Sequence, residues 1–70
     1  MRISLQPGSR VVIELGPKQG PATVDARLHS ETYRLRTDDG VLVIKHFSQI
    51  ARFISPEEDR AMNTVHQLEN

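Results

Sequence analysis

Residues 22–46 read ATVDARLHSETYRLRTDDGVLVIKH, and this stretch decides the fold. Apolar and polar residues alternate over 22–28 and again over 32–37, as they do in strands with one buried and one solvated face. A short loop at 29–31 separates the two segments. Asp39-Gly40 is a strong two-residue hairpin turn before a further apolar strand at 41–46. The stretch therefore predicts an antiparallel meander of three strands.

A two-residue turn at Asp39-Gly40 also sets the expected strand register. It places Leu35 opposite Ile44 and Tyr33 opposite His46, with positions 28 and 33 paired in the preceding hairpin. In this register the apolar positions share one face. The other face carries a row of three basic side chains, Arg27, Arg34 and Lys45.

The flanking segments complete a small domain. A strand is expected at 10–15 after the turn Pro7-Gly8, and the Gly- and Pro-rich residues 16–21 are expected to be a rigid connector without regular structure. A tight turn at 48–49 precedes a last strand at 51–54. Ser55-Pro56-Glu57-Glu58 then starts a helix, with Ser at the N-cap, Pro at the first position and Glu completing a capping box. We predict a single domain over 1–70, mainly β, with five antiparallel strands over 8–54 and a C-terminal helix over 55–68.

Composition excludes several classes of site. The chain has 70 residues and no cysteine, which rules out disulfides, iron–sulfur clusters and thiolate zinc sites. No apolar run approaches the roughly 20 residues that span a bilayer, and no signal peptide is visible, so a cytoplasmic protein without membrane contact is expected. The formal net charge of zero conceals an asymmetry, because residues 1–54 carry three net positive charges and residues 55–70 three net negative charges.

The strand and turn pattern resembles the SH3-like small β-barrels. Gly8, Val11 and Ile13, followed by Gly16-Pro17 and Gly20, are similar to the strand–loop–strand of KOW-type motifs in ribosomal and transcription-elongation proteins. Pro21 stands near where that motif has a further glycine. The resemblance covers about residues 8–54 and implies a five-stranded SH3-like barrel, in a family whose members bind nucleic acid or nucleoprotein complexes.

A second resemblance is to the small chaperones of nickel–iron hydrogenase maturation, which are a short barrel followed by a C-terminal helix. Pro7-Gly8, Val41-Leu42-Val43 and His46 before an acidic helix start are similar to that family. Its working residue is a cysteine directly after the initiator methionine, where this chain has Arg2. The resemblance therefore implies the barrel and a protein partner, without the iron-handling chemistry.

The basic row is the leading candidate site. Like charges on neighbouring strands repel, so a cluster of them suggests a binding face for phosphate or for an acidic protein. Its members are Arg27, Arg34 and Lys45, with Arg36 and Lys18 nearby. The alternative is an ordinary solvated face that Asp25 partly neutralises. Because the chain as a whole is not basic, high-affinity, sequence-blind nucleic-acid binding is not expected.

Two further sets of residues are candidates. Tyr33 and His46 could stack a base at the barrel mouth, or could be rim residues with one polar end in water. Phe47 and Phe53 are expected in the core or against the helix. An apolar stripe on the helix is expected either to cap the barrel or to form a homodimer, with the acidic first turn in water. This stripe consists of Ala61, Met62, Val65 and Leu68.

No catalytic constellation is present in the sequence. The three histidines lack metal-binding spacing, Asp38-Asp39 belongs to a turn, and no serine lies in a nucleophile motif. We therefore expect no enzyme activity, no metal and no cofactor. The leading hypothesis is a small regulatory or adaptor module that binds nucleic acid or a nucleoprotein complex through the basic row. The alternative is a protein–protein or homo-oligomeric module that uses the helix stripe or a strand edge.

Overall fold

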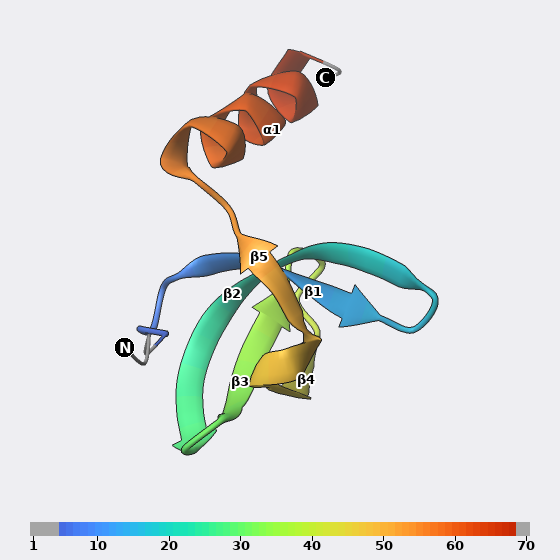
Figure 1. Cartoon of the computed structure of the whole chain (residues 1–70). Helices are drawn as coiled ribbons and strands as arrows, with labels where there is room; N and C mark the ends of the chain where they lie inside the picture. The colour runs from blue at the N-terminus through green and yellow to red at the C-terminus, as the bar shows by residue number, and fades with distance from the viewer. Residues whose placement is uncertain (1–4, 69–70) are drawn as a thin grey trace.

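The computed structural model describes residues 5–68, with side chains described through residue 62. The predicted fold class is confirmed: five antiparallel strands form one sheet and a single helix follows (Figure 1). The elements are β1 (Arg10–Leu15), β2 (Lys18–His29), β3 (Thr32–Thr37), β4 (Leu42–His46), the 3₁₀ turn η1 (Phe47–Gln49), β5 (Ile50–Phe53) and α1 (Pro56–Leu68).

The sheet curls around the long strand β2. The strand order is β4-β3-β2-β1-β5. The first half of β2 pairs with β1 and its second half with β3, so the strand arcs through the molecule and bends the sheet toward a barrel (Figure 1). β4 and β5 are not paired to each other, so the sheet is not closed and has two edges. The two edges matter because an unpaired strand offers backbone groups to a partner.

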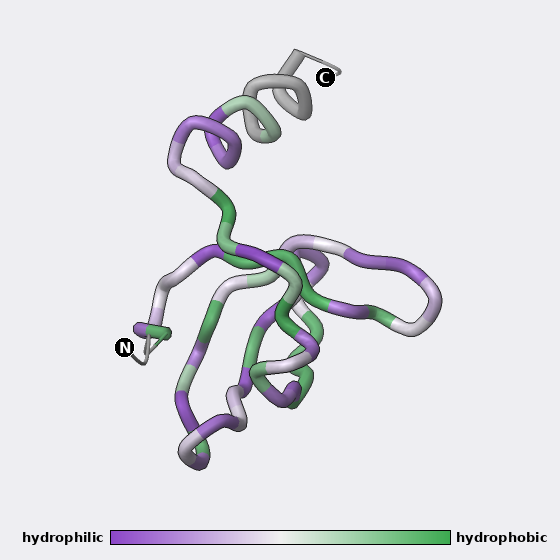
Figure 2. The backbone as a smooth tube through the Cα atoms, in the orientation of Figure 1, coloured by the Kyte–Doolittle hydropathy of each residue, from purple (hydrophilic) through white to green (hydrophobic). Residues whose placement is uncertain are grey.

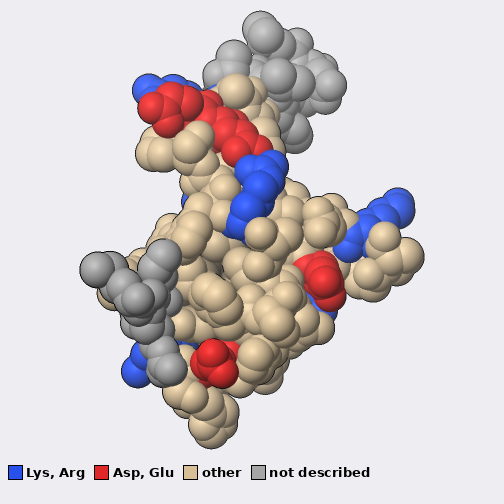
Figure 3. Space-filling view, viewed as in Figure 1, with Lys and Arg blue, Asp and Glu red and all other residues tan. Residues whose placement is uncertain are grey.

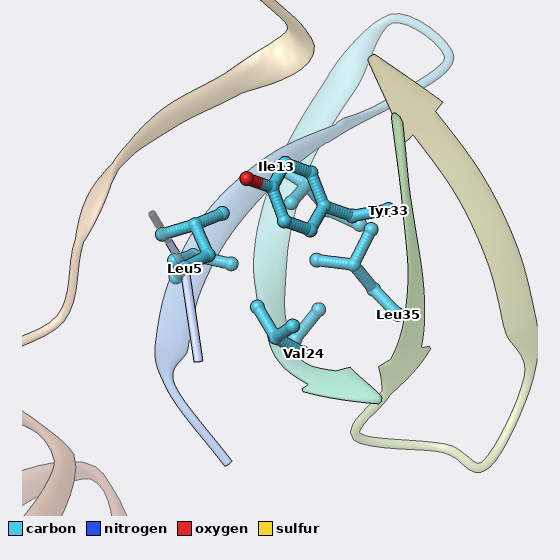
Figure 4. Packing of buried hydrophobic residues seen from close by; sticks show 7 residues of the cluster. Leu5, Ile13, Val24, Tyr33 and Leu35 are labelled. Atoms are coloured by element: carbon cyan, nitrogen blue, oxygen red, sulfur yellow. The ribbon is translucent and has the colours of Figure 1, made fainter. Parts of the chain in front are cut away.

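The core lies on the concave side of this sheet. The predicted inward faces of β1 and β3 are confirmed, since Val11, Ile13 and Leu35 are fully buried and Tyr33 is 2% exposed. Side chains from β1, β2, β3 and the segment before β1 point toward one another in Figure 4. In Figure 2 the hydrophobic segments follow the same strands, whereas the first turn of α1 is hydrophilic.

The expected connector at 16–21 is mostly strand, so this prediction is wrong. Leu15 pairs with Lys18, which leaves Gly16-Pro17 as a two-residue hairpin turn. Gly16 has φ +66°, a conformation that a two-residue turn with glycine first requires. Pro21 fits in β2 opposite Val12 because β3 does not pair with that part of β2 and no ladder hydrogen bond is lost on that side.

The expected register between β3 and β4 is wrong by one residue. The structure pairs Leu35 with Val43 and Arg34 with Ile44. The cause is the turn, because the amide of Thr37 donates to the carbonyl of Val41 at 2.8 Å, and the loop between them therefore holds three residues, 38–40. A third loop residue with positive φ is typical of the next most common hairpin, and Gly40 has φ +90°.

The register between β2 and β3 is also more complex than expected. Near the turn His29 pairs with Thr32, as the expected register requires. Two bulges then shift the pairing, so that Val24 lies opposite Leu35. Each bulge shifts by one residue which side chains of β2 face the core. As a result Leu28, which continues the apolar positions of 22–28, is 39% exposed.

The helix start is confirmed, whereas the first of the two expected roles of the helix, capping of the barrel, is not found. The amide of Glu58 donates to Ser55 Oγ at 3.1 Å, as an N-cap requires. The helix extends away from the sheet instead of capping it (Figure 1). Glu57 in the first turn is exposed as expected, and the half-buried Glu58 and Asp59 form ion pairs with Arg52 and Arg10.

The three-residue turn gives the first testable prediction. Replacing Gly40 by Ala places a Cβ on a residue with φ +90°, and we expect a loss of about 1–2 kcal/mol in the free energy of unfolding, measured by urea denaturation. Gly40→Asn is the control, because asparagine tolerates positive φ better and should lose less. Equal stability of Gly40→Ala and wild type would contradict this turn and the register that follows from it.

Candidate interaction surface on strand β4

The register of β4 exposes large hydrophobic side chains. Leu42 and Ile44 point away from the core and are 52% and 62% exposed. Val41 and Phe47, at the two ends of the strand, are 53% and 39% exposed. We call these four residues the β4 strip. They account for four of the six exposed large hydrophobic residues in the part of the chain that the structure describes.

Two arginines of β3 border the β4 strip. Arg36 lies opposite Leu42 and Arg34 opposite Ile44, and residues paired directly across an antiparallel ladder share a face. Arg34 is held by Asp25, whose Oδ2 accepts from the guanidinium at 2.6 Å. Arg36 is exposed and forms no ion pair among the described residues. The surface is therefore hydrophobic with a basic margin.

Within residues 5–68, no strand pairs with the backbone of β4 on its outer side. The Thr37 amide donates to the Val41 carbonyl, so the backbone groups of Val41 face β3. Because successive residues of an antiparallel strand face opposite edges, the N–H and C=O groups of Leu42, Ile44 and His46 face the free edge. The His46 amide is already satisfied, because it donates to Gln49 Oε1 at 3.0 Å. The groups of Leu42 and Ile44 remain available for another strand.

The expected row of Arg27, Arg34 and Lys45 is not formed. The bulges in β2 place Arg27 opposite Tyr33 and Ala26 opposite Arg34, and the slipped β4 register puts Lys45 opposite Tyr33. Basic side chains lie at separate places on the face shown in Figure 3 rather than in one patch. Lys18 is the first residue of β2, beside the β1–β2 turn.

Tyr33 and His46 do not form the expected stacking pair. Tyr33 pairs with Lys45 and is buried in the core, where it cannot present a ring face to a ligand. His46 is exposed: its Nδ1 lies 2.9 Å from Ser48 Oγ and its Nε2 lies 3.7 Å from Glu31 Oε2. These contacts cap η1 and have a structural role. The expectation for Phe47 and Phe53 is also wrong, since both are exposed.

Arg10 joins the turn before β4 to the helix. Its guanidinium donates to both carboxylate oxygens of Asp38, at 2.7 and 3.0 Å, and to Thr23 Oγ1 at 2.9 Å. Its Nε donates to Asp59 Oδ1 at 3.1 Å. The hydrogen bonds that Arg10 donates lower the pKa of Asp38, and the same bonds to the Asp38 and Asp59 carboxylates raise the pKa of Arg10. Figure 3 shows acidic and basic atoms in contact where the helix joins the sheet.

The structure describes the side chains of two of the four residues of the helix stripe. Ala61 is exposed and Met62 is half-buried. The side chains of Val65 and Leu68 lie outside the described residues.

The described residues offer little for chemistry. They contain no group of three or more His, Asp or Glu side chains placed to hold a metal ion. An open pocket of about 370 Å³ lies between the segment before β1 and β2. Its lining residues are Leu5, Gln6, Pro7, Ala26 and Arg27. This lining provides no acid–base pair and no nucleophile.

Over the described part of the chain, no helix has both the length and the apolar character needed to cross a bilayer.

Comparisons with protein-family models, with curated proteins and with solved structures found no match for this chain. The resemblances to KOW-type barrels and to hydrogenase-maturation chaperones stay predictions. The sequence interpretation missed the β4 strip, although a signal was present: Asp38-Asp39-Gly40 also fits a three-residue loop with glycine last.

The Arg10–Asp38 pair gives a prediction about pH. Because the folded pKa of Asp38 lies below its ordinary value of 3.8, the pair stabilises the fold above that value, and its contribution is lost as the pH falls through the lower, folded pKa. We expect Asp38→Asn to cost about 0.5–1 kcal/mol at pH 7, because the carboxylate is half exposed. This difference should shrink as the pH falls below the ordinary value and through the lower, folded pKa, as measured by chemical denaturation. A difference that does not change with pH would contradict the role of this pair.

Proposed function

We propose that the protein is a non-catalytic adaptor module that binds a protein partner through the β4 strip. The observation that supports this most directly is the concentration of exposed large hydrophobic side chains at residues 41–47. Single exposed hydrophobic residues are common on protein surfaces, whereas a contiguous group is typical of an interaction site. The adjacent free backbone edge adds a second mode of contact.

The chemistry of the surface favours protein over nucleic acid. Three of the four side chains of the β4 strip are aliphatic and cannot stack on bases, and Phe47 is the one aromatic residue among them. The two bordering arginines fit acidic residues at the rim of a protein partner, where such charges provide specificity and steering. Nucleic-acid binding is the rival hypothesis. It rests on the exposed Arg27, Arg36 and Lys18, which the register does not gather into one row.

Binding partners distinguish the two hypotheses. We expect Leu42→Ser/Ile44→Ser to lose the proteins that the tagged wild type retains from native cell extract, at both 150 mM and 500 mM salt, because burial of apolar surface is not screened. Phe53→Ser is the matched control, since Phe53 is a comparably exposed hydrophobic residue on the other edge strand. The measurement is quantitative mass spectrometry of the retained proteins.

A second titration tests the rival. Mixed RNA and DNA oligonucleotides at low salt should leave the amide chemical shifts unchanged. Binding that is lost in Arg27→Gln/Arg36→Gln and weakens steeply with salt would overturn the proposal in favour of nucleic acid.

A further inference from the structure

We infer that the partner of β4 is a second copy of this chain. In this arrangement, two β4 strands pair antiparallel about a two-fold axis that passes between Ile44 and the partner's Ile44. The two sheets then continue into each other across the axis. The inference rests on the proposed function and specifies the partner and the register.

The backbone of β4 suits this pairing. Ile44 directs its N–H and C=O groups to the free edge, so two copies of Ile44 can exchange both hydrogen bonds as a directly opposed pair. The N–H of Leu42 can likewise donate to the carbonyl of the partner's His46. The His46 amide stays bonded to Gln49, which ends the ladder after the last β4 residue.

The side chains match in the same register. Ile44 meets the partner's Ile44 at the centre, and Leu42 meets the partner's His46 on the same face of the sheet. Just beyond the two ends of the ladder, the exposed Val41 lies nearest the partner's Phe47. Lys45 falls opposite the partner's Val43 and not opposite the partner's Lys45. The pairing therefore avoids like charges in direct opposition, which destabilise cross-strand pairs.

The nearest alternative register is less well matched. Centring the axis on Val43 also preserves the alternation of the ladder and pairs Leu42 with the partner's Ile44, but it draws the turn residue Gly40 opposite the partner's His46 and places Phe47 opposite the partner's Asp39. It also places Lys45 opposite the partner's Val41, so no apolar pair remains at the ends. The Ile44-centred register keeps the turn 38–40 outside the ladder.

Site-specific crosslinking tests this register, because the chain has no cysteine of its own. With Ile44→Cys, mild oxidation should give a disulfide-linked dimer of twice 7.9 kDa on non-reducing gels, since opposed Cα atoms in such a pair are about 5.5 Å apart. Val43→Cys and Phe53→Cys are the controls and should remain monomeric. Crosslinking of Val43→Cys in place of Ile44→Cys would overturn the register.

Sedimentation of the full chain without cysteine tests the dimer itself. Wild type should change from monomer to dimer with rising concentration, and Ile44→Lys should raise the dissociation constant at least about tenfold, because it removes a buried side chain and opposes two like charges. Leu28→Lys, at another exposed leucine, should leave the constant unchanged. A wild type that stays monomeric at every concentration, with no Ile44→Cys dimer, would overturn the inference.

Together with the retention experiment, sedimentation distinguishes failure of this inference from failure of the proposed function. If the chain is monomeric but Leu42→Ser/Ile44→Ser still loses its retained proteins, the β4 strip binds a different protein, and only the inference fails. If the chain is monomeric and nothing depends on the strip, both fail.

Discussion

The number of residues in the turn between β3 and β4 is the constraint on which the outer surface depends. Side chains alternate along a strand, so one additional loop residue exchanges its inner and outer faces. Here the turn holds 38–40, and Val43 packs against the core while Leu42 and Ile44 face outward. The Thr37 hydroxyl accepts from the Val41 amide at 3.0 Å and contacts the Asp39 carboxylate, which fixes the geometry of the loop.

Arg10 connects this turn to the position of the helix. One guanidinium contacts Asp38 in the turn and Asp59 in the first turn of α1, while Glu58 and Arg52 form a second pair at 2.8 Å. The helix is thus attached at its start, next to β5. Because β5 and β4 are the opposite edges of the sheet, a helix that follows β5 and extends away leaves β4 uncovered (Figure 1).

The sequence predicted the elements well and their registers poorly. Alternation identified the inward residues of β1 and β3, and Ser55 marked the helix start, because these signals are local. The positions of the bulges in β2 and the number of residues in the turn at Gly40 are not fixed by such local signals. More than one bulge or turn geometry fits the same residues, and packing elsewhere in the sheet determines which one forms. Each error shifted a strand by one residue, so the predicted basic row and the Tyr33–His46 pair both disappeared while the fold remained correct.

An exposed apolar edge strand is a hazard for a small protein, and the two edges of this sheet are managed differently. The β5 edge ends at Phe53, after which the chain continues to α1. Arg52 of β5 forms an ion pair with Glu58 of α1. The β4 edge is short, and its outer face carries the exposed Leu42 and Ile44. Pairing of β4 with β4 uses the same edge on both copies, so it closes after two chains. Pairing of β4 with β5 would leave a free edge at each end and permit continued growth. If β4 pairs with β4 as we propose, the assembly therefore closes as a dimer and leaves no free β4 edge for further growth.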